Sequence, residues 1–226
     1  MTTRTSLSIS VSSGIAVSAL ATIPKAASAC LVFAHGAGAG MDHPFIVAVC
    51  EGLAARRMAT LRYQFPYMEK GSRRPDAAPL CHKAVAAAVA AAHERLPSLP
   101  LFAGGKSFGA RMTSQAQALT PFPHVHGLCF FGFPLHPPQQ PTTKRADHLA
   151  AIHIPLLFLQ GTRDALAQLP LIQSVVARLS APSTLKIIDH ADHSFHVPVR
   201  SGSTDEEVLN SMLDETVTWA TDVQKQ

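Results

Sequence analysis

Apolar and polar residues follow two different patterns in the early and the later parts of the chain. Leu7 to Val11 and Ile15 to Ile23 alternate apolar with small or polar residues on either side of Ser12-Ser13-Gly14, which predicts a β-hairpin. From Cys30 onward, short unbroken apolar runs predict strands that are buried on both faces. These strands are expected at 30–34, 59–63, 101–103, 127–131, 155–159 and 185–188.

Segments with helical character separate these strands. Asp42 is expected to cap the first helix, because Pro44 falls in its first turn. Thr204, with Glu207 three residues later, makes a capping box for the last helix. Further helices are expected at the Ala-rich residues 80–95, at 108–119, and from the strand at 155–159 to about residue 179.

The alternation of strands and helices indicates an α/β fold. Such an order favours one mostly parallel central sheet with helices on both faces. The chain has 226 residues, of which 47% are hydrophobic, and it contains no internal repeat or low-complexity linker. This length suits one α/β domain with a large core, so we expect a single domain over residues 1–226.

Charge does not point to a nucleic-acid partner. The net charge is +4, and charged residues make up only 15% of the chain. The densest basic cluster, Lys70 with Arg73 and Arg74, is short and lies among glycine and proline residues. A nucleic-acid surface needs a larger basic patch. We therefore expect a solvated loop there and no nucleic-acid partner.

The N-terminal part resembles an export signal in one respect. Ala27-Ser28-Ala29-Cys30 has the form of a signal-peptidase or lipoprotein cleavage site. However, polar residues and a proline interrupt the preceding apolar stretch, and cleavage there would remove the predicted hairpin. No segment reaches the ~18 to 20 apolar residues of a membrane span. We expect a cytoplasmic protein with no signal peptide and no membrane partner.

The four cysteines agree with that expectation. Cys30, Cys50, Cys81 and Cys129 include no pair with the C-x-x-C spacing of a zinc or redox site. Three of them lie in apolar runs, where a free cysteine behaves as a small hydrophobic side chain. Free buried thiols are typical of a reducing compartment.

The strongest chemical signal is Gly105-Lys106-Ser107-Phe108-Gly109, between a predicted strand and a predicted helix. This is the G-x-S-x-G pattern of a nucleophile elbow, in which a strained turn presents the central serine. Small residues two positions away keep the strand and the helix from colliding. Ser107 is therefore the candidate nucleophile. A phosphate-binding P-loop is excluded, because the glycine that it needs at position 100 is Pro100.

A glycine-rich loop, His35 to Gly40, follows the first buried strand. In a fold with a nucleophile elbow, this loop supplies one N–H of the oxyanion hole, and the residue after the nucleophile supplies the other. Here these N–H groups belong to Ala37 and Phe108. A dinucleotide fingerprint is disfavoured, because it needs a glycine at Met41 and an acidic residue after the next strand.

A serine nucleophile needs a base that a carboxylate holds in place. Asp164 directly follows the strand at 155–159, where the acid of this fold is expected. His190, His193 and His196 follow the last strand. We choose His193 as the base, because His190 lies too close to the strand end. The spacing of these histidines also suits a metal, but the cluster has no helical frame and no cysteine partner. We expect no metal and no cofactor.

These motifs together resemble a group of α/β-hydrolases. The group includes the testis-expressed 30 protein and the hydrolase-like domain of the third subunit of the NSL histone acetyltransferase complex. The chain is also similar, at a greater distance, to dienelactone hydrolases. After Asp164 the chain has Ala165-Leu166 where the group often has Pro-Phe, which leaves the carboxylate in place. The matching segments are colinear and cover 32–40, 104–111, 132–138, 158–164 and 191–195.

The resemblance implies an α/β-hydrolase fold with a minimal cap and a triad of Ser107, His193 and Asp164. We expect a serine hydrolase, of the carboxylesterase type, that acts on small or medium acyl esters through an acyl-enzyme on Ser107. Thioesterase and peptidase chemistry share this intermediate and remain alternatives. An interaction module that keeps the fold with weak or no activity is an alternative of a different class.

The substrate, a small-molecule ester, is expected to enter above the carboxyl ends of the strands, between the loops 65–79 and 133–150. His35, Arg111 and His136 are candidate substrate-binding residues, although Arg111 and His136 suit a structural salt bridge or hydrogen bond equally well. Lys106 is expected to have a structural role, because the elbow points its side chain away from the cleft. A monomer and a homodimer fit the sequence equally.

Overall fold

An eight-stranded sheet forms the centre of the computed structural model, which describes residues 1–225. Its strands are β1 (Thr2–Ser12), β2 (Ile15–Pro24), β3 (Ala29–Ala34), β4 (Met58–Tyr63), β5 (Leu101–Lys106), β6 (Val125–Phe131), β7 (Leu156–Gly161) and β8 (Ser183–Ile188). They lie in the order β1-β2-β4-β3-β5-β6-β7-β8. β2 is antiparallel to β1 and β4, and the remaining neighbours are parallel. The predicted α/β architecture is confirmed.

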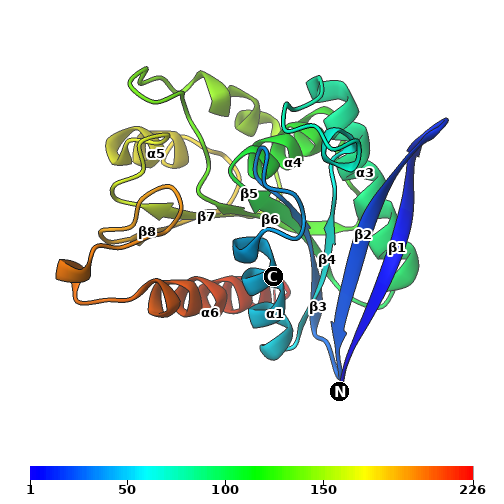
Figure 1. Cartoon of the computed structure of the whole chain (residues 1–226). Coiled ribbons are helices and arrows are strands. Elements are labelled where there is room, and N and C mark those ends of the chain that lie inside the picture. The colour runs from blue at the N-terminus through cyan, green and yellow to red at the C-terminus, as the bar shows by residue number, and fades with distance from the viewer. Residues whose placement is uncertain (226) are drawn as a thin grey trace.

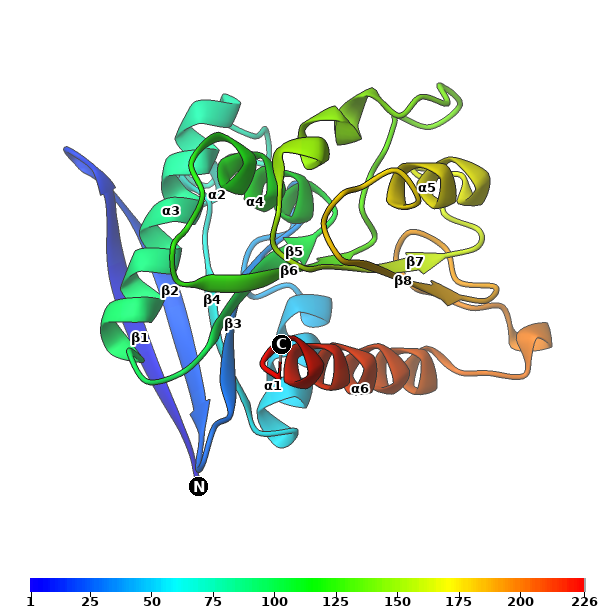
Figure 2. The same ribbon diagram turned by 180° about the vertical axis from the view of Figure 1, so that it is seen from behind.

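β1 and β2 form the predicted hairpin at one edge of the sheet (Figure 1). Seen from behind, the pair stands along the edge beside helix α3 (Ala78–Arg95) (Figure 2). Ile9 and Val17 are buried against that side of the core, whereas their neighbours along the strands are more exposed. The hairpin therefore alternates because only one of its faces is covered, and the central strands do not because helices cover both.

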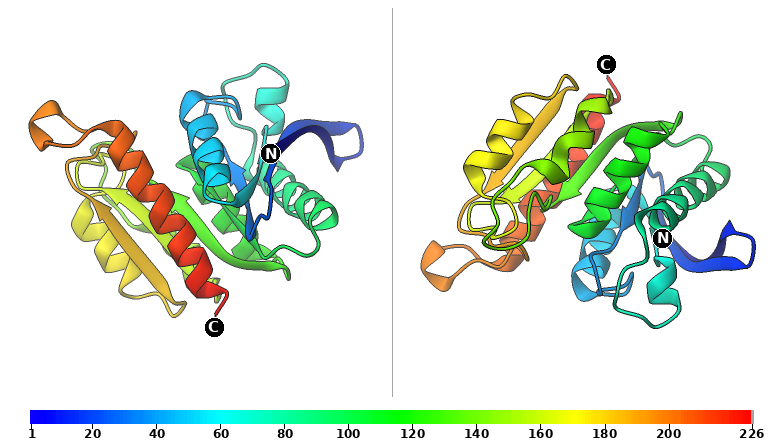
Figure 3. Two further views of the ribbon diagram at one scale, coloured as in Figure 1. Left: turned by 90° about the horizontal axis from the view of Figure 1, so that it is seen from below. Right: turned by 90° about the horizontal axis from the view of Figure 1, so that it is seen from above.

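Helices lie on both faces of the sheet, and each face has its own buried cluster (Figures 1 and 3). α1 (Pro44–Ala55) and α6 (Asp205–Val223) cover one face. The other face carries α3, α4 (Phe108–Leu119) and α5 (Leu169–Val176). Shorter elements lie in the loops: α2 (Pro66–Glu69) and the 3₁₀ helices η1 (Lys144–Ala151) and η2 (Val199–Ser201). No helix among residues 1–225 combines the length and the apolar character that crossing a bilayer requires.

The first helix is capped by His43, and the expectation that Asp42 caps it is wrong. The Nδ1 atom of His43 accepts a hydrogen bond from the N–H of Phe45 at 3.3 Å. The carboxylate of Asp42 instead pairs with Arg62 of β4 at 3.2 Å. Because the helix begins at Pro44, the residue directly before the proline takes the capping position.

The connection between β6 and β7 contains one regular element, the 3₁₀ helix η1. It rises above the carboxyl end of the sheet together with α2 and the loop that follows it (Figure 1). This is the minimal cap that the proline-rich segment predicts. Within the same described residues, all four cysteines are buried and free, as expected.

The capping box of α6 offers a test of the C-terminal packing. The N–H of Glu207 donates to Thr204 Oγ1 at 3.2 Å, and the Glu207 carboxylate accepts from the N–H of Thr204 at 2.8 Å. We expect Thr204→Ala to lower the free energy of unfolding by about 1 kcal/mol in urea titrations. Thr221→Ala, in the last turn of the same helix, is the control, and an equal loss in both variants would contradict the assignment.

Candidate active site

Ser107 alone makes the turn between β5, which ends at Lys106, and α4, which begins at Phe108. Its backbone has φ 53° and ψ −110°, a conformation that costs a non-glycine residue about 1–3 kcal/mol. Hydrogen bonds on both sides hold it there. The N–H of Ser107 donates to the carbonyl of Phe131, and its own carbonyl accepts from Arg111, each at 3.1 Å.

The glycines of the motif allow β3 to approach the turn closely. A Cβ atom on Gly105 would lie 2.5 Å from the carbonyl oxygen of Ala34, and one on Gly109 would lie 2.4 Å from the same atom. Real side chains do not tolerate such contacts with backbone atoms. The G-x-S-x-G spacing is therefore a packing requirement between β3, β5 and α4, as the sequence predicts.

Three side chains from different loops form one chain of hydrogen bonds. Ser107 Oγ lies 2.8 Å from His193 Nε2, and His193 Nδ1 lies 2.7 Å from Asp164 Oδ2. A carboxylate can only accept, so Nδ1 carries the ring proton and Nε2 is free to accept from the serine hydroxyl. Ser107 follows β5, Asp164 follows β7 and His193 follows β8. The structure thus brings the three residues chosen from the sequence together.

Asp164 is a buried carboxylate, 4% exposed, whose oxygens are well supplied with donors. Besides His193, the amide of Gln160 donates to Oδ2 at 2.5 Å and the N–H of Leu166 donates to Oδ1 at 2.7 Å. The amide oxygen of Gln160 in turn accepts from the N–H of Phe133 at 3.1 Å. Sequence reasoning gave Gln160 no role. Its polar side chain in an otherwise apolar buried strand was the available signal.

The loop that carries Asp164 is tied to the loop that carries the histidines. The N–H of Arg163 donates to the carbonyl of Ala191 at 2.9 Å. The N–H of His190 donates to Thr162 Oγ1 at 2.8 Å. These bonds continue the pairing of β7 with β8 beyond the strand ends, so the acid and the base are held at a fixed separation.

Lys106 lies in the wall of the site, and the expectation that it points away from the cleft is wrong. Its Nζ donates to the carbonyl oxygen of His193 at 2.5 Å and lies over the Phe195 ring, 5.0 Å from the centroid. Phe45 packs on the other side at 5.9 Å. Burial lowers the pKa of Lys106 to about 8, against the opposing fields of the Asp164 and Asp192 carboxylates.

Two cavities meet at Ser107. The larger, of about 500 Å³, lies between the loop before α3 and the β6–β7 connection, next to Phe108 and Arg111. The smaller, of about 310 Å³, lies on the side of His193, Lys106 and Phe45. Ala37, Ser107 and Leu166 belong to both walls. The larger cavity lies between the two loops where the sequence predicts substrate entry.

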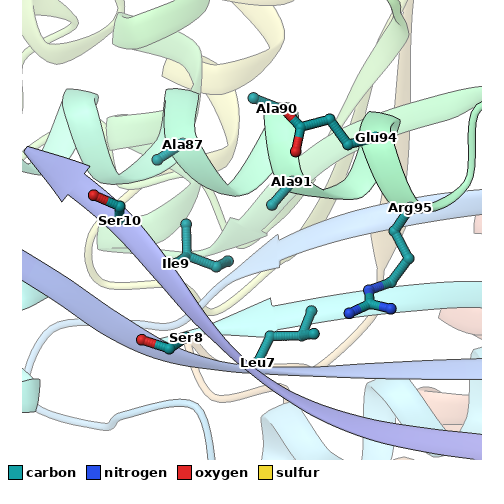
Figure 4. Close-up of a pocket in the computed structure, with 9 residues that line it drawn as sticks. All are labelled: Leu7, Ser8, Ile9, Ser10, Ala87, Ala90, Ala91, Glu94 and Arg95. Atoms are coloured by element: carbon teal, nitrogen blue, oxygen red, sulfur yellow. The ribbon is translucent and has the colours of Figure 1, made fainter.

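A roomier groove lies elsewhere, between β1 and α3, with a volume of about 590 Å³ (Figure 4). Small and apolar side chains line most of it, and Glu94 and Arg95 stand at one end. Its serines, Ser8 and Ser10, have no histidine beside them among the lining residues. The candidate active site is therefore at the cavities beside Ser107, where a histidine contacts the serine, and not in this groove.

The N–H groups of Ala37 and Phe108 both belong to residues that line the larger cavity. Within residues 1–225, neither N–H donates to a backbone or side-chain acceptor. Phe108 is the first residue of α4, where the helix dipole favours negative charge. The two groups expected from the sequence are thus free to bind an oxygen that develops negative charge beside Ser107.

His35 does not lie where a substrate contact requires it. Its side chain is completely buried; Nδ1 donates to the carbonyl of Gly36 at 2.7 Å, and Nε2 accepts from the N–H of Phe65 at 3.1 Å. Burial lowers the pKa of this imidazole to about 4, so it is neutral at ordinary pH. The structure gives His35 the role of a brace between two loops, in place of the expected role in substrate binding.

His136 has a similar place, which likewise does not fit substrate binding. It is 1% exposed; Nδ1 donates to the carbonyl of Pro137 at 2.8 Å, and Nε2 accepts from the N–H of Gln168 at 3.4 Å. Of the alternatives that the sequence left open for His136, the structural hydrogen bond is the one observed. Arg111, by contrast, lies in the wall of the larger cavity.

The other two histidines of the last loop do not join the chain of hydrogen bonds at Ser107. His196 Nδ1 pairs with Asp205 at 2.8 Å, and His190 adopts a positive φ of 60° at the strand end. In the part of the chain that the structure describes, no group of three His, Cys, Asp or Glu side chains is arranged to hold a metal ion.

Comparison with known proteins places this site in a family. A family model described as an alpha/beta hydrolase domain matches residues 27–221. The chain belongs to the α/β-hydrolase family. The matched range includes the elbow, the acid loop and the histidine loop. The narrower resemblance to the testis-expressed 30 group stays a prediction.

Solved structures of other α/β-hydrolases share the fold of this chain. A dienelactone hydrolase from Anabaena variabilis superposes with a TM-score of 0.78 at 21% identity, over 98% of both chains. A serine hydrolase without a lid from Xanthomonas campestris gives a TM-score of 0.73 at 16% identity, over 96% of this chain and 94% of that one. Est1E from Butyrivibrio proteoclasticus, with ferulic acid bound, gives a TM-score of 0.70 at 17% identity, over 93% of this chain and 99% of that one.

The close approach of Ala34 to the elbow predicts which glycines of this α/β-hydrolase can be replaced by alanine without a loss of stability. We expect Gly109→Ala to lower the free energy of unfolding by about 1–3 kcal/mol or more, because its Cβ would overlap the backbone of β3. Gly36→Ala is the matched control, since its Cβ would meet nothing nearer than 3.7 Å. Denaturant unfolding of both variants measures the difference, and equal stability would contradict the packing argument.

The buried amine of Lys106 predicts a pH-dependent stability. Burial lowers its pKa from 10.5 to about 8, so between these values the unfolded chain holds the Lys106 proton and the folded protein does not. We therefore expect the wild type to gain free energy of unfolding, relative to Lys106→Met, as pH rises from 8 to 10.5. Urea titrations at several pH values test this, with the exposed Lys25→Met as control; a constant difference would refute it.

Proposed function

We propose that this α/β-hydrolase is a serine carboxylesterase that cleaves small or medium acyl esters through an acyl-enzyme on Ser107. The observation that carries the proposal is the hydrogen-bonded chain from Ser107 through His193 to Asp164 at the junction of two cavities. A serine hydroxyl is a weak nucleophile by itself, and such a chain is the arrangement that activates it.

In the first half of the reaction, Ser107 Oγ attacks the acyl carbon while His193 Nε2 takes the hydroxyl proton. The carbonyl electron pair moves to the oxygen, which the N–H groups of Ala37 and Phe108 stabilise as an oxyanion. Each such donor is worth about 10²–10³ in rate. The tetrahedral intermediate then collapses, the bond to the alcohol oxygen breaks, and His193 returns the proton to the leaving alcohol.

In the second half, water replaces the alcohol. His193 takes a proton from the water while the water oxygen attacks the acyl carbon. The bond from the acyl carbon to Ser107 Oγ then breaks, His193 returns the proton to Oγ, and the acid is released. Asp164 stays ionised throughout: it keeps the ring proton on Nδ1 and stabilises the imidazolium that forms in each half. The donors from Gln160 and Leu166 support that charge in its buried place.

The size and walls of the cavities support a small or medium ester. Volumes of about 500 and 310 Å³ fit short acyl and alcohol groups. His193, which protonates the leaving group, lines the smaller cavity, whereas the oxyanion donor Phe108 lines the larger one. These positions support an arrangement with the alcohol on the side of Phe45 and Lys106 and the acyl group on the side of Arg111.

A fluorophosphonate probe and p-nitrophenyl butyrate test the proposal. We expect wild-type protein to be labelled and to hydrolyse the ester, and Ser107→Ala to lose labelling. Hydrolysis should fall by roughly 10³-fold or more in Ser107→Ala and in His193→Ala, because each removes a member of the activating chain. Ser8→Ala, an exposed serine of the groove in Figure 4, is the matched control and should keep both activities.

A folded wild type that neither reacts with the probe nor hydrolyses the ester would overturn the esterase proposal. Labelling at Ser107 with turnover of thioesters or peptides, but not oxygen esters, would keep the acyl-enzyme and replace the substrate class. Circular dichroism spectra of each variant separate loss of chemistry from loss of fold.

A further inference from the structure

Two arginines face the larger cavity without a carboxylate partner. Arg111 comes from α4 and Arg145 from η1, and both line the cavity that holds Ser107. Among the residues that the structure describes, neither guanidinium forms an ion pair or a side-chain hydrogen bond. Both arginines are half-buried and line the same cavity, so an anion bound there would meet two unpaired guanidinium groups.

Arg111 is fixed in place and partly removed from water. Its guanidinium lies over the ring of Phe108, 5.9 Å from the centroid, and its Nε is buried with no hydrogen-bond partner in residues 1–225. Burial, and after it the field of Arg145, lower the pKa of Arg111 below its ordinary value. Both guanidinium groups line the same cavity and carry the same charge, so they repel each other.

The remaining groups around the cavity do not cancel this charge. Asp76 lines the same wall, but it lies more than 4.0 Å from either arginine, and its Oδ2 is itself buried without a partner among the described residues. His148, behind α4, is neutral, because burial and then the field of Arg111 lower its pKa to about 4. Two positive groups against one negative group leave the cavity with a net positive charge.

The position of Arg111 relative to Ser107 limits the length of the acyl group that can reach it. Arg111 is four residues after Ser107, and a helix rises by 1.5 Å per residue, so its backbone lies roughly 6 Å further along α4. The Arg111 side chain leans back over the ring of Phe108, so its guanidinium lies within about one helical turn of Ser107. A short acyl group attached to Ser107 and extended into the larger cavity would therefore present its far end to Arg111 and Arg145.

We propose that the larger cavity binds an acyl group that ends in a carboxylate, so that the substrates are half-esters of short dicarboxylic acids, with Arg111 and Arg145 as the anion-binding residues. This inference rests on the proposed esterase function for its catalytic step. A carboxylate at this place would accept hydrogen bonds from the guanidinium groups and relieve their mutual repulsion.

Monoethyl glutarate and ethyl valerate test the proposal as a matched pair, because they have acyl chains of equal length and differ in the terminal carboxylate. Ethanol release gives kcat/KM for each. We expect the wild type to prefer the half-ester by about tenfold or more, since hydrogen bonds between a guanidinium and a carboxylate are stronger than those between neutral groups. The preference should shrink as salt is added.

The variants are compared by the ratio of kcat/KM for monoethyl glutarate to kcat/KM for ethyl valerate. We expect Arg111→Met to reduce the preference for the half-ester by about tenfold, and Arg145→Met to reduce it by a smaller factor. Arg111→Lys keeps the charge and should retain part of the preference. Asp76→Asn removes the opposing charge and should increase it. Arg178→Met, whose side chain lines neither cavity at Ser107, is the matched control and should leave the ratio unchanged.

A direct binding measurement separates this inference from the esterase proposal. Calorimetry of glutarate with Ser107→Ala, and with Ser107→Ala combined with Arg111→Met, needs no turnover. Binding that is lost with Arg111 supports the anion site even if no ester is cleaved. Equal rates for the two esters in the wild type, a ratio that Arg111→Met leaves unchanged, or no detectable binding of glutarate would overturn it.

Discussion

The approach of the end of β3 to the turn after β5 is the contact on which the site depends. The carbonyl oxygen of Ala34 occupies the space where side chains at 105 and 109 would stand. The glycines there let the chain enter α4 after a single strained residue. Ser107 is thereby placed beside the loop that follows β3, which carries the N–H of Ala37. One backbone contact thus positions both Ser107 and the N–H groups that we propose to stabilise its oxyanion.

The opposite half of the site depends on a buried charge. Asp164 keeps its carboxylate in the protein interior because Gln160, Leu166 and His193 donate to it. Gln160 accepts in turn from the N–H of Phe133, and Leu166 accepts from the N–H groups of Leu135 and His136. A buried carboxylate with this support is costly to displace, since removal of a donor leaves charge uncompensated. The imidazole therefore has one tautomer and one orientation, and β7 and β8 act as its frame.

Local signals in the sequence were enough to locate much of this arrangement. Apolar runs predicted the strands, and the order of Ser107, Asp164 and His193 along the chain placed them after β5, β7 and β8. Most of the errors concern contacts between distant segments. Whether His35 faces a ligand or the N–H of Phe65 is decided 30 residues away. The same holds for Lys106, which reaches the carbonyl of His193, and for Gln160, whose role needed the fold to bring Phe133 beside it. The error on Asp42 was local: the helix begins at Pro44, so His43 takes the cap, and the Asp42 carboxylate pairs with Arg62 of β4.

Leu166 combines two tasks that its backbone and its side chain perform separately. Its N–H holds Asp164, and its carbonyl accepts from the N–H groups of Leu135 and His136 at 2.8 and 3.0 Å. The side chain, meanwhile, lies in the walls of both cavities. Main-chain bonds survive most substitutions, whereas the shape of the wall changes with each one. A substitution at this position therefore changes the shape of both cavities while the backbone bonds that hold Asp164 stay in place.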